Sequence, residues 1–352
     1  GALGSWRTLS AEQLAAFIAM PSLTGMSTSV KSAFTLGMID VGIFTTGLVS
    51  TKVSSRAKLY RPAAVGAVER DLLPHLTYPE RILVTGGYRY TGGGQFDRHN
   101  LLTAELALRV AEFLPRVGTV LGESLSGVDF LAGTGLGQRS LANQRRAADA
   151  TFVREDGMRV VVEMTASVTP YLSEKIRRWV HVLATTTLAH SGVTVMFLGA
   201  PKPDRINPTR GANEFRSYMK QAVREAIREY PGIAGANPHE RIGVALWEDF
   251  FPQPGRVSED FLNLGVEMVG AHGSGWRKES LWNLPLDPLQ PGFLPAVITG
   301  AAATASPPSW LRRIPGVPQV HKFALHHAGL DENTSAVAAR RGRLSTHPSL
   351  DE

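Results

Sequence analysis

Apolar and polar positions alternate along two neighbouring segments in the middle of the chain. Residues 148–154 predict the start of a strand, residues 155–157 a tight hairpin turn and residues 158–165 the partner strand. Because side chains on a strand alternate between its two faces, Glu163 and Thr165 share a face. Glu163 therefore interrupts an apolar run. A buried carboxylate is costly unless a positive charge or a bound cation compensates it.

Helical and strand patterns alternate on either side of this hairpin. Upstream, apolar residues recur at helical spacing over residues 100–114. Downstream, residues 173–183 predict a helix with Lys175 on the flank of its apolar stripe. Continuous apolar runs at 193–199 and 242–247 predict buried strands, the first with the character of a parallel sheet. We therefore expect an α/β fold, α+β overall, in which helices flank a mixed sheet.

The N-terminal region has a different pattern. Ser10 is a capping residue for a helix over residues 10–18, and a second helix is predicted over 27–36. A short apolar piece at 38–44 and a basic loop that closes at 58–62 follow. This order is typical of a small winged helix-turn-helix, and an ordinary helical subdomain with a solvated loop is the alternative. We expect DNA contacts from the basic residues Lys31, Lys52, Arg56, Lys58 and Arg61, joined by Arg145 and Arg146 ahead of the hairpin.

The chain divides into four expected parts. Residues 6–84 are the winged-helix domain, residues 85–98 a glycine-rich linker, residues 99–269 the sheet domain and residues 270–352 an extended proline-rich tail. Tryptophans in the tail suggest segments that dock on the core or on a partner, namely Trp276, Trp282 and Trp310.

Two tyrosines of the glycine-rich linker are candidates for contact with DNA. Tyr88 and Tyr90 stand in flexible backbone, where aromatic rings can stack on unpaired bases. If the protein used a tyrosine nucleophile, either would also be the candidate. A connector without a binding role is the alternative.

Composition and charge narrow the classes of function. The chain of 352 residues contains no cysteine, which excludes disulfide scaffolds, thiolate metal sites and thiol nucleophiles. With 37 Lys and Arg against 31 Asp and Glu, the net charge of +6 favours a polyanionic partner. A helix over residues 213–230 carries a basic stripe of Lys220, Arg224 and Arg228, which could follow a phosphate backbone but is more often a solvated face. We find no membrane span or signal peptide and expect a cytoplasmic protein.

The central pattern resembles a known nuclease motif. Asp149, the hairpin, Glu163 and the following helix with Lys175 resemble the PD-(D/E)xK motif of the restriction-endonuclease-like fold. More closely, residues 10–265 resemble the replication-relaxation family of plasmid proteins, which join a winged helix to such a core. Conjugative relaxases of this fold are a more distant resemblance. The resemblance implies a DNA-binding protein of a plasmid or mobile element that nicks DNA in replication or mobilisation.

The resemblance also implies roles for individual acids. Asp149 and Glu163 would be the ligands of Mg²⁺, or of Mn²⁺, which activates water and stabilises the charge that develops on the phosphate. A third catalytic acid usually comes from the preceding helix, for which Glu105 fits best and Glu123 is the reserve.

The lysine of the motif is missing from its usual place. Thr165 stands there, and Lys175 could supply the ammonium from the next helix to offset negative charge in the transition state. If Lys175 cannot reach, the protein is a non-catalytic replication or partition regulator, a homodimer built on the core, or a component of a nucleoprotein assembly. A purely structural alternative also stands, in which Asp149 caps a turn and Glu163 forms a buried ion pair with Lys175.

Overall fold

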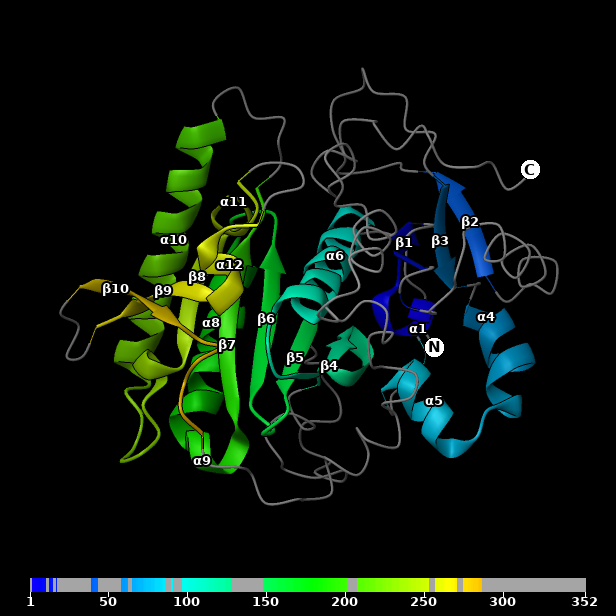
Figure 1. The fold of residues 1–352 in the computed structure, drawn as a ribbon, viewed down its shortest axis with the longest axis horizontal. Coiled ribbons are helices and arrows are strands. Elements are labelled where there is room, and N and C mark those ends of the chain that lie inside the picture. The colour runs from blue at the N-terminus through cyan, green and yellow to red at the C-terminus, as the bar shows by residue number, and fades with distance from the viewer. Residues whose placement is uncertain are drawn as a thin grey trace, which may run out of the picture.

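The computed structural model describes residues 2–10, 13–14, 17, 39–43, 58–62, 65–86, 90, 97–127, 148–201, 208–252, 257–270 and 275–286. These residues form a mixed α/β structure with one seven-stranded sheet and one three-stranded sheet. Figure 1 shows the larger sheet and the smaller N-terminal sheet on opposite sides of one long helix, α6 (Asp97–Phe113). Among the described residues, no helix is long and apolar enough to cross a membrane.

The seven strands of the large sheet lie side by side in chain order. The two strands at each edge run antiparallel to their neighbours, and the three central strands run parallel to one another. The strands are β4 (Val117–Gly122), β5 (Ala150–Arg154), β6 (Arg159–Thr165), β7 (Val193–Gly199), β8 (Ile242–Leu246), β9 (Gly265–Val269) and β10 (Trp276–Ser280).

Helices cover both faces of this sheet. Parallel neighbouring strands require crossover connections, and these supply the helices of one face. Two long helices, α8 (Pro170–Thr185) and α10 (Pro208–Glu229), provide the crossovers and pack on one face. A short helix, α9 (Leu188–Ser191), follows α8 in the chain. The other face is covered by α6 together with α11 (Trp247–Phe250) and α12 (Glu259–Asn263).

The alternation of side chains divides the core between the two faces. On β6, Val160, Val162 and Met164 belong to the cluster that contains α6, whereas Val161 belongs to the cluster of α8 and α10. Glu163 therefore faces α8. This alternation is the one that the sequence predicts for a strand.

The N-terminal segments form a small antiparallel sheet in the order β1-β3-β2, built from β1 (Leu9–Ser10), β2 (Ile39–Ile43) and β3 (Lys58–Pro62). The helices α1 (Ala2–Trp6), α4 (Val65–Ala67) and α5 (Tyr78–Thr85) accompany it. Leu3, Trp6, Leu9 and Tyr60 share one apolar cluster with residues of α6 and the large sheet. This region therefore packs directly on the sheet domain.

Most of the predicted elements of the sheet domain are confirmed. The hairpin, the strands at 193–199 and 242–247 and the helices over 173–183 and 213–230 correspond to observed elements. The helix over 100–114 corresponds to α6, which begins three residues earlier than predicted.

The prediction of an extended tail from residue 270 is wrong for its first part. Strand β10 pairs with β9 at the edge of the large sheet, and Trp282 is fully buried. Its carbonyl and that of Leu284 accept hydrogen bonds from the buried guanidinium of Arg154. Trp276 packs partly buried on α10, as expected of a docking residue. Trp310 and the rest of the tail lie outside the described residues.

The prediction for Tyr90 is also wrong, because its side chain is buried in a cluster with Val68, Leu73 and Val84 and is not available to a base. Tyr88 lies outside the described residues, as do the helix predicted over 27–36 and the basic residues Lys31, Lys52, Arg56, Arg145 and Arg146. Of the remaining basic residues proposed for DNA contact, Lys58 and Arg61 stand on β3.

Candidate active site

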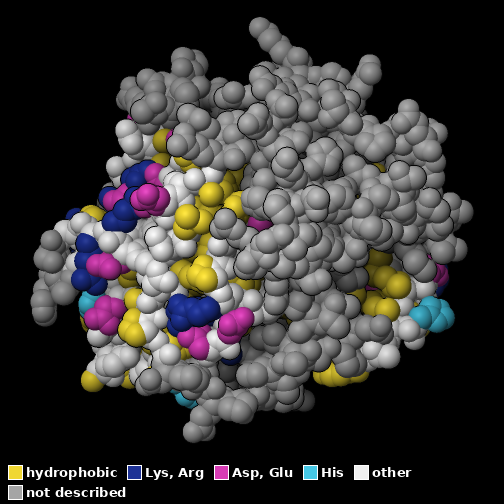
Figure 2. Space-filling model, in the orientation of Figure 1, with side chains coloured by type: hydrophobic (Ala, Val, Ile, Leu, Met, Phe, Trp, Pro, Cys, Tyr) yellow, Lys and Arg dark blue, Asp and Glu magenta, His cyan; other side chains and the backbone are white. Residues whose placement is uncertain are grey.

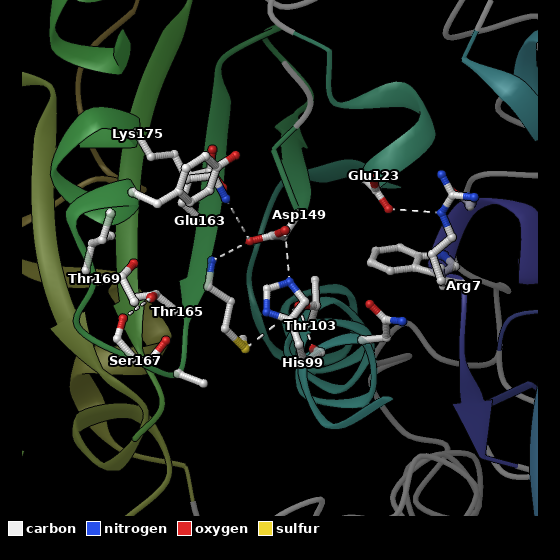
Figure 3. A pocket seen from close by; sticks show the side chains of 17 residues that line it. Arg7, His99, Thr103, Glu123, Asp149, Glu163, Thr165, Ser167, Thr169 and Lys175 are labelled. Carbon is white, nitrogen blue, oxygen red and sulfur yellow. Dashed lines mark hydrogen bonds and ion pairs between the residues drawn. The ribbon is translucent and has the colours of Figure 1, made fainter. Parts of the chain in front are cut away.

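A pocket of about 460 Å³ opens where β6 ends and α8 begins, and the N-terminal segment forms its opposite wall (Figure 3). The close approach of that wall depends on Gly122 at the end of β4, where a Cβ atom would lie 2.5 Å from the carbonyl oxygen of Ser5. Acidic and basic side chains and one imidazole line the pocket, namely Arg7, His99, Glu123, Asp149, Glu163 and Lys175.

The two predicted acids lie beside each other. The antiparallel register of β5 and β6 pairs Ala150 with Val162, so that Asp149, directly before β5, lies opposite Glu163. The backbone N–H of Asp149 donates to the carbonyl of Val162 at 3.1 Å and continues the hairpin by one residue. A hairpin turn determines this register, and for that reason the sequence predicts the pair correctly.

Lys175 connects the two carboxylates. Its Nζ atom lies 3.8 Å from Oδ2 of Asp149 and forms an ion pair with Oε2 of Glu163. One turn further along α8, the indole Nε1 of Trp179 donates to Oε1 of Glu163 at 2.5 Å. The lysine therefore reaches both acids from the helix. The same contact is the buried ion pair of the structural alternative, and the geometry accommodates both interpretations.

His99 is a member of the site that the sequence reasoning missed. Its Nε2 lies 2.9 Å from Oδ1 of Asp149, and the backbone N–H of Met164 donates to Oδ2 of the same carboxylate at 2.7 Å. In Figure 3, His99 and Thr103 project from α6 toward Asp149. The sequence did contain one signal of this role, because His99 is a polar residue one turn ahead of the apolar stripe of α6.

Glu105 does not belong to the pocket, contrary to the prediction. His99 and Thr103 are four residues apart and share one face of α6, whereas Glu105 is two residues further and lies about 200° around the helix. Its side chain is buried, and its charge acts on the fully buried guanidinium of Arg109. The reserve acid Glu123 does line the pocket, where it accepts a hydrogen bond from Nε of Arg7 at 2.9 Å.

The surroundings separate the pKa values of the two acids. Burial raises the pKa of Glu163 to about 7, and the charge of Asp149 adds to this effect while Lys175 opposes it. Burial alone would also raise the pKa of Asp149, but the positive charges of His99 and Lys175 outweigh it and hold that pKa well below its usual range. Two neighbouring carboxylates with separated pKa values are a frequent property of active sites.

The cations of the site respond to the same charges. Burial by itself would lower the pKa values of Lys175 and His99, but the charges of Asp149 and Glu163 outweigh burial and raise both. Lys175 is therefore an ammonium ion at neutral pH. It neutralises one negative charge of the carboxylate pair.

Comparison of the chain with protein-family models, with curated proteins and with solved structures gave no match. The functional assignment therefore rests on the chemistry of the site.

Two carboxylates of the pocket are the residues that could hold a hard divalent cation. Carboxylate oxygens are the ligands that Mg²⁺ prefers, and Mg²⁺ is commonly held by one or two carboxylates together with water and substrate phosphates. Asp149 and Glu163 would supply the two protein ligands. Within the described part of the chain, no group of three or more histidines and acids has the geometry to hold a metal by itself. A cation held by these two carboxylates would need further ligands from water or substrate oxygens.

The charged surface around α10 is mixed in sign. Figure 2 shows basic and acidic side chains interspersed there. Arg216 pairs with Asp249 at 2.7 Å and with Glu267 at 2.6 Å, and Lys220 also pairs with Glu267. Lys220 and Arg224 lie over the ring of Trp276. These contacts engage the first two residues of the predicted basic stripe with the protein itself, which favours the alternative of a solvated face.

Proposed function

We propose that this protein is a metal-dependent DNA endonuclease that nicks DNA, with Asp149, Glu163 and Lys175 as its active site. The observation that carries the proposal is the meeting, in one pocket, of two carboxylates from adjacent strands and an ammonium group from the following helix. This is the arrangement that the PD-(D/E)xK resemblance implies, except that Lys175 supplies the ammonium group that the motif lysine would supply from position 165.

The order of elements supports the proposal. The helix α6, the antiparallel strands β4, β5 and β6, the helix α8 and the parallel strand β7 follow one another in the chain. A restriction-endonuclease-like core is expected to carry its acids on the hairpin of such a series. At the N-terminus, the antiparallel order β1-β3-β2 supports a winged helix that would hold DNA beside the pocket.

Each of the three residues of the proposed active site then has a distinct role. When bound, Mg²⁺ or Mn²⁺ would activate a water molecule and stabilise charge on the phosphate. Asp149 is held ionised by His99 and Lys175 and is ready to bind a cation. Glu163 becomes a ligand only in its ionised form, so metal binding is favoured above a pH of about 7. The ammonium of Lys175 would stabilise negative charge that develops on the phosphate.

A second candidate is a non-catalytic DNA-binding regulator of plasmid replication or partition. The observation that favours it is the charge balance of the pocket, because Lys175 and His99 compensate the two carboxylates without a metal ion. In that case the ion pairs would stabilise the fold, and the DNA contacts would come from the N-terminal region.

Nicking of supercoiled plasmid DNA tests the choice. The plasmid should carry the native locus of the protein, and the reaction is run with Mg²⁺, with Mn²⁺ and with a chelator. We expect open circles only with metal. Asp149→Asn, Glu163→Gln and Lys175→Met should each slow nicking about 100-fold or more, with DNA binding retained in a gel-shift assay.

Glu174→Gln is the matched control, because Glu174 is an exposed acid on the same helix as Lys175. It should nick at the wild-type rate. DNA binding without any metal-dependent nicking would decide for the regulator, and nicking that survives all three site substitutions would remove the site from the proposal.

A further inference from the structure

An exposed aromatic ring stands at the mouth of the pocket. Tyr171 lies in the first turn of α8, one turn before Lys175, and lines the same pocket. The residue is 64% exposed. A ring that remains this exposed contributes little to folding through burial, whereas a ligand that covers it would remove its apolar surface from water.

A cation already lies over this ring. The guanidinium carbon of Arg178 is 5.7 Å from the ring centroid of Tyr171, two turns further along α8. Within the described part of the chain, Arg178 forms no ion pair, and its Nε atom is buried without a hydrogen-bond partner. Arg178 therefore packs a cation on the ring from one side. The high exposure of Tyr171 leaves ring surface accessible for a planar group.

The depth of the site restricts what can reach it. Glu163 is only 2% exposed, and the end of α1 with Trp6 and Arg7 closes the far side of the pocket. A volume of about 460 Å³ is in the range of sites that enclose one small molecule, and a nucleotide is of that size. Bases in a duplex are stacked on their neighbours, so a tyrosine face can stack only on a base that has left the helix or is single-stranded.

We infer that the pocket takes an unpaired nucleotide of single-stranded DNA, with its base stacked on Tyr171 and an adjoining phosphate beside Lys175. This inference rests on the proposed function and specifies its substrate. The segment from the end of β6 to the start of α8 supplies hydroxyl groups along the same rim, from Thr165, Ser167 and Thr169. Hydroxyl groups are common partners of backbone phosphates and would hold the strand without reading its sequence.

Binding without metal tests the inference separately from cleavage. The full chain is titrated, in chelator, into a fluorescein-labelled single-stranded oligonucleotide of about 20 nucleotides, long enough for typical single-strand sites. A hairpin duplex of the same sequence is titrated in parallel, and fluorescence anisotropy gives both affinities. Tyr171→Ala should weaken single-strand binding about 5- to 150-fold and leave duplex binding unchanged.

Two further variants control for the ring itself. Tyr171→Phe keeps the ring and should bind the single strand as the wild type does. Tyr78→Ala removes a tyrosine of similar exposure, 68%, that does not line the pocket, and it should also bind normally.

The inference is overturned if the wild type does not bind the single strand, if Tyr171→Ala binds it normally, or if Tyr78→Ala or the duplex shows an equal loss. Nicking that persists beside any of these results leaves the endonuclease proposal standing without this substrate. Single-strand binding that depends on Tyr171 in a protein that never nicks supports the inference about binding and rejects the endonuclease.

Discussion

Replacement of Glu163 by Gln should make the protein more stable at alkaline pH. In the folded protein, the pKa of this carboxyl is raised from 4.5 to about 7, chiefly by burial. The folded state therefore binds the proton more tightly than the unfolded chain. The stability that protonated Glu163 contributes is complete below pH 4.5 and is lost as the pH rises through about 7.

The magnitude follows from that interval. The difference between 4.5 and about 7 corresponds to about 3 kcal/mol in the free energy of unfolding. Gln resembles the protonated acid and does not titrate, so Glu163→Gln should not show this loss. The pKa of His99 is raised as well: burial lowers it, Asp149 outweighs burial, and Glu163 adds the smallest effect. Because Asp149 is present in both proteins, most of this contribution cancels in their difference.

Thermal and urea unfolding between pH 4.5 and 8.5, in chelator, measure the effect. The stability of Glu163→Gln relative to the wild type should increase by about 3 kcal/mol between the two ends, or roughly 6–12 °C in melting temperature. Glu174→Gln, which changes an exposed acid of α8, should follow the wild type at every pH. Parallel curves for Glu163→Gln and the wild type would refute the reasoning that burial outweighs the ion pair with Lys175.

Three further predictions concern the same structure. Trp179→Phe removes the donor to Oε1 of Glu163 and should lower the free energy of unfolding by about 1–3 kcal/mol in urea; an unchanged midpoint would contradict the hydrogen bond. Arg241→Leu leaves several buried carbonyls without their guanidinium donor and should cost about 3 kcal/mol or more, with or without metal; a smaller loss would show that other donors replace it. Mg²⁺ at about 100 times its Kd should stabilise the wild type by about 2.7 kcal/mol in a thermal-shift assay, whereas Asp149→Asn should show no shift; equal shifts would place the metal elsewhere.

Several features of the site could be predicted because they depend on nearby residues. The hairpin sets the register that brings Asp149 beside Glu163, and Lys175 follows only twelve residues after Glu163, on the helix that the strand leads into. Turn geometry and strand alternation are local properties of the chain. These local elements were enough to predict that Lys175 could replace the motif lysine, which is absent because Thr165 stands in its position.

Other features depend on contacts between distant segments. The choice between His99 and Glu105 depends on the rotation of α6 about its axis, which is fixed by the packing of its apolar stripe against β4, β5 and β6. A stripe of apolar residues defines the buried side of a helix only broadly. A rotation well within that breadth decides which polar side chain reaches Asp149.

The edge strand β10 was missed for a related reason. Its residues, Trp276–Ser280, are mostly polar, because an edge strand at the surface has little need of apolar side chains. Pairing with β9 provides its backbone hydrogen bonds, and no pattern within the sequence of β10 predicts that partner.

The amino-acid sequence by itself determined the alternation of helices and strands, the hairpin and the placement of one acid on each of its two strands, since each of these follows from periodicity within a short segment. Only the tertiary structure decided that His99 joins Asp149, that Trp6 and Arg7 close the pocket, and that Tyr171 stands at its mouth. The physical reason is that these contacts arise when separate apolar surfaces pack together, and the final orientation of each element reflects the shape of all the others.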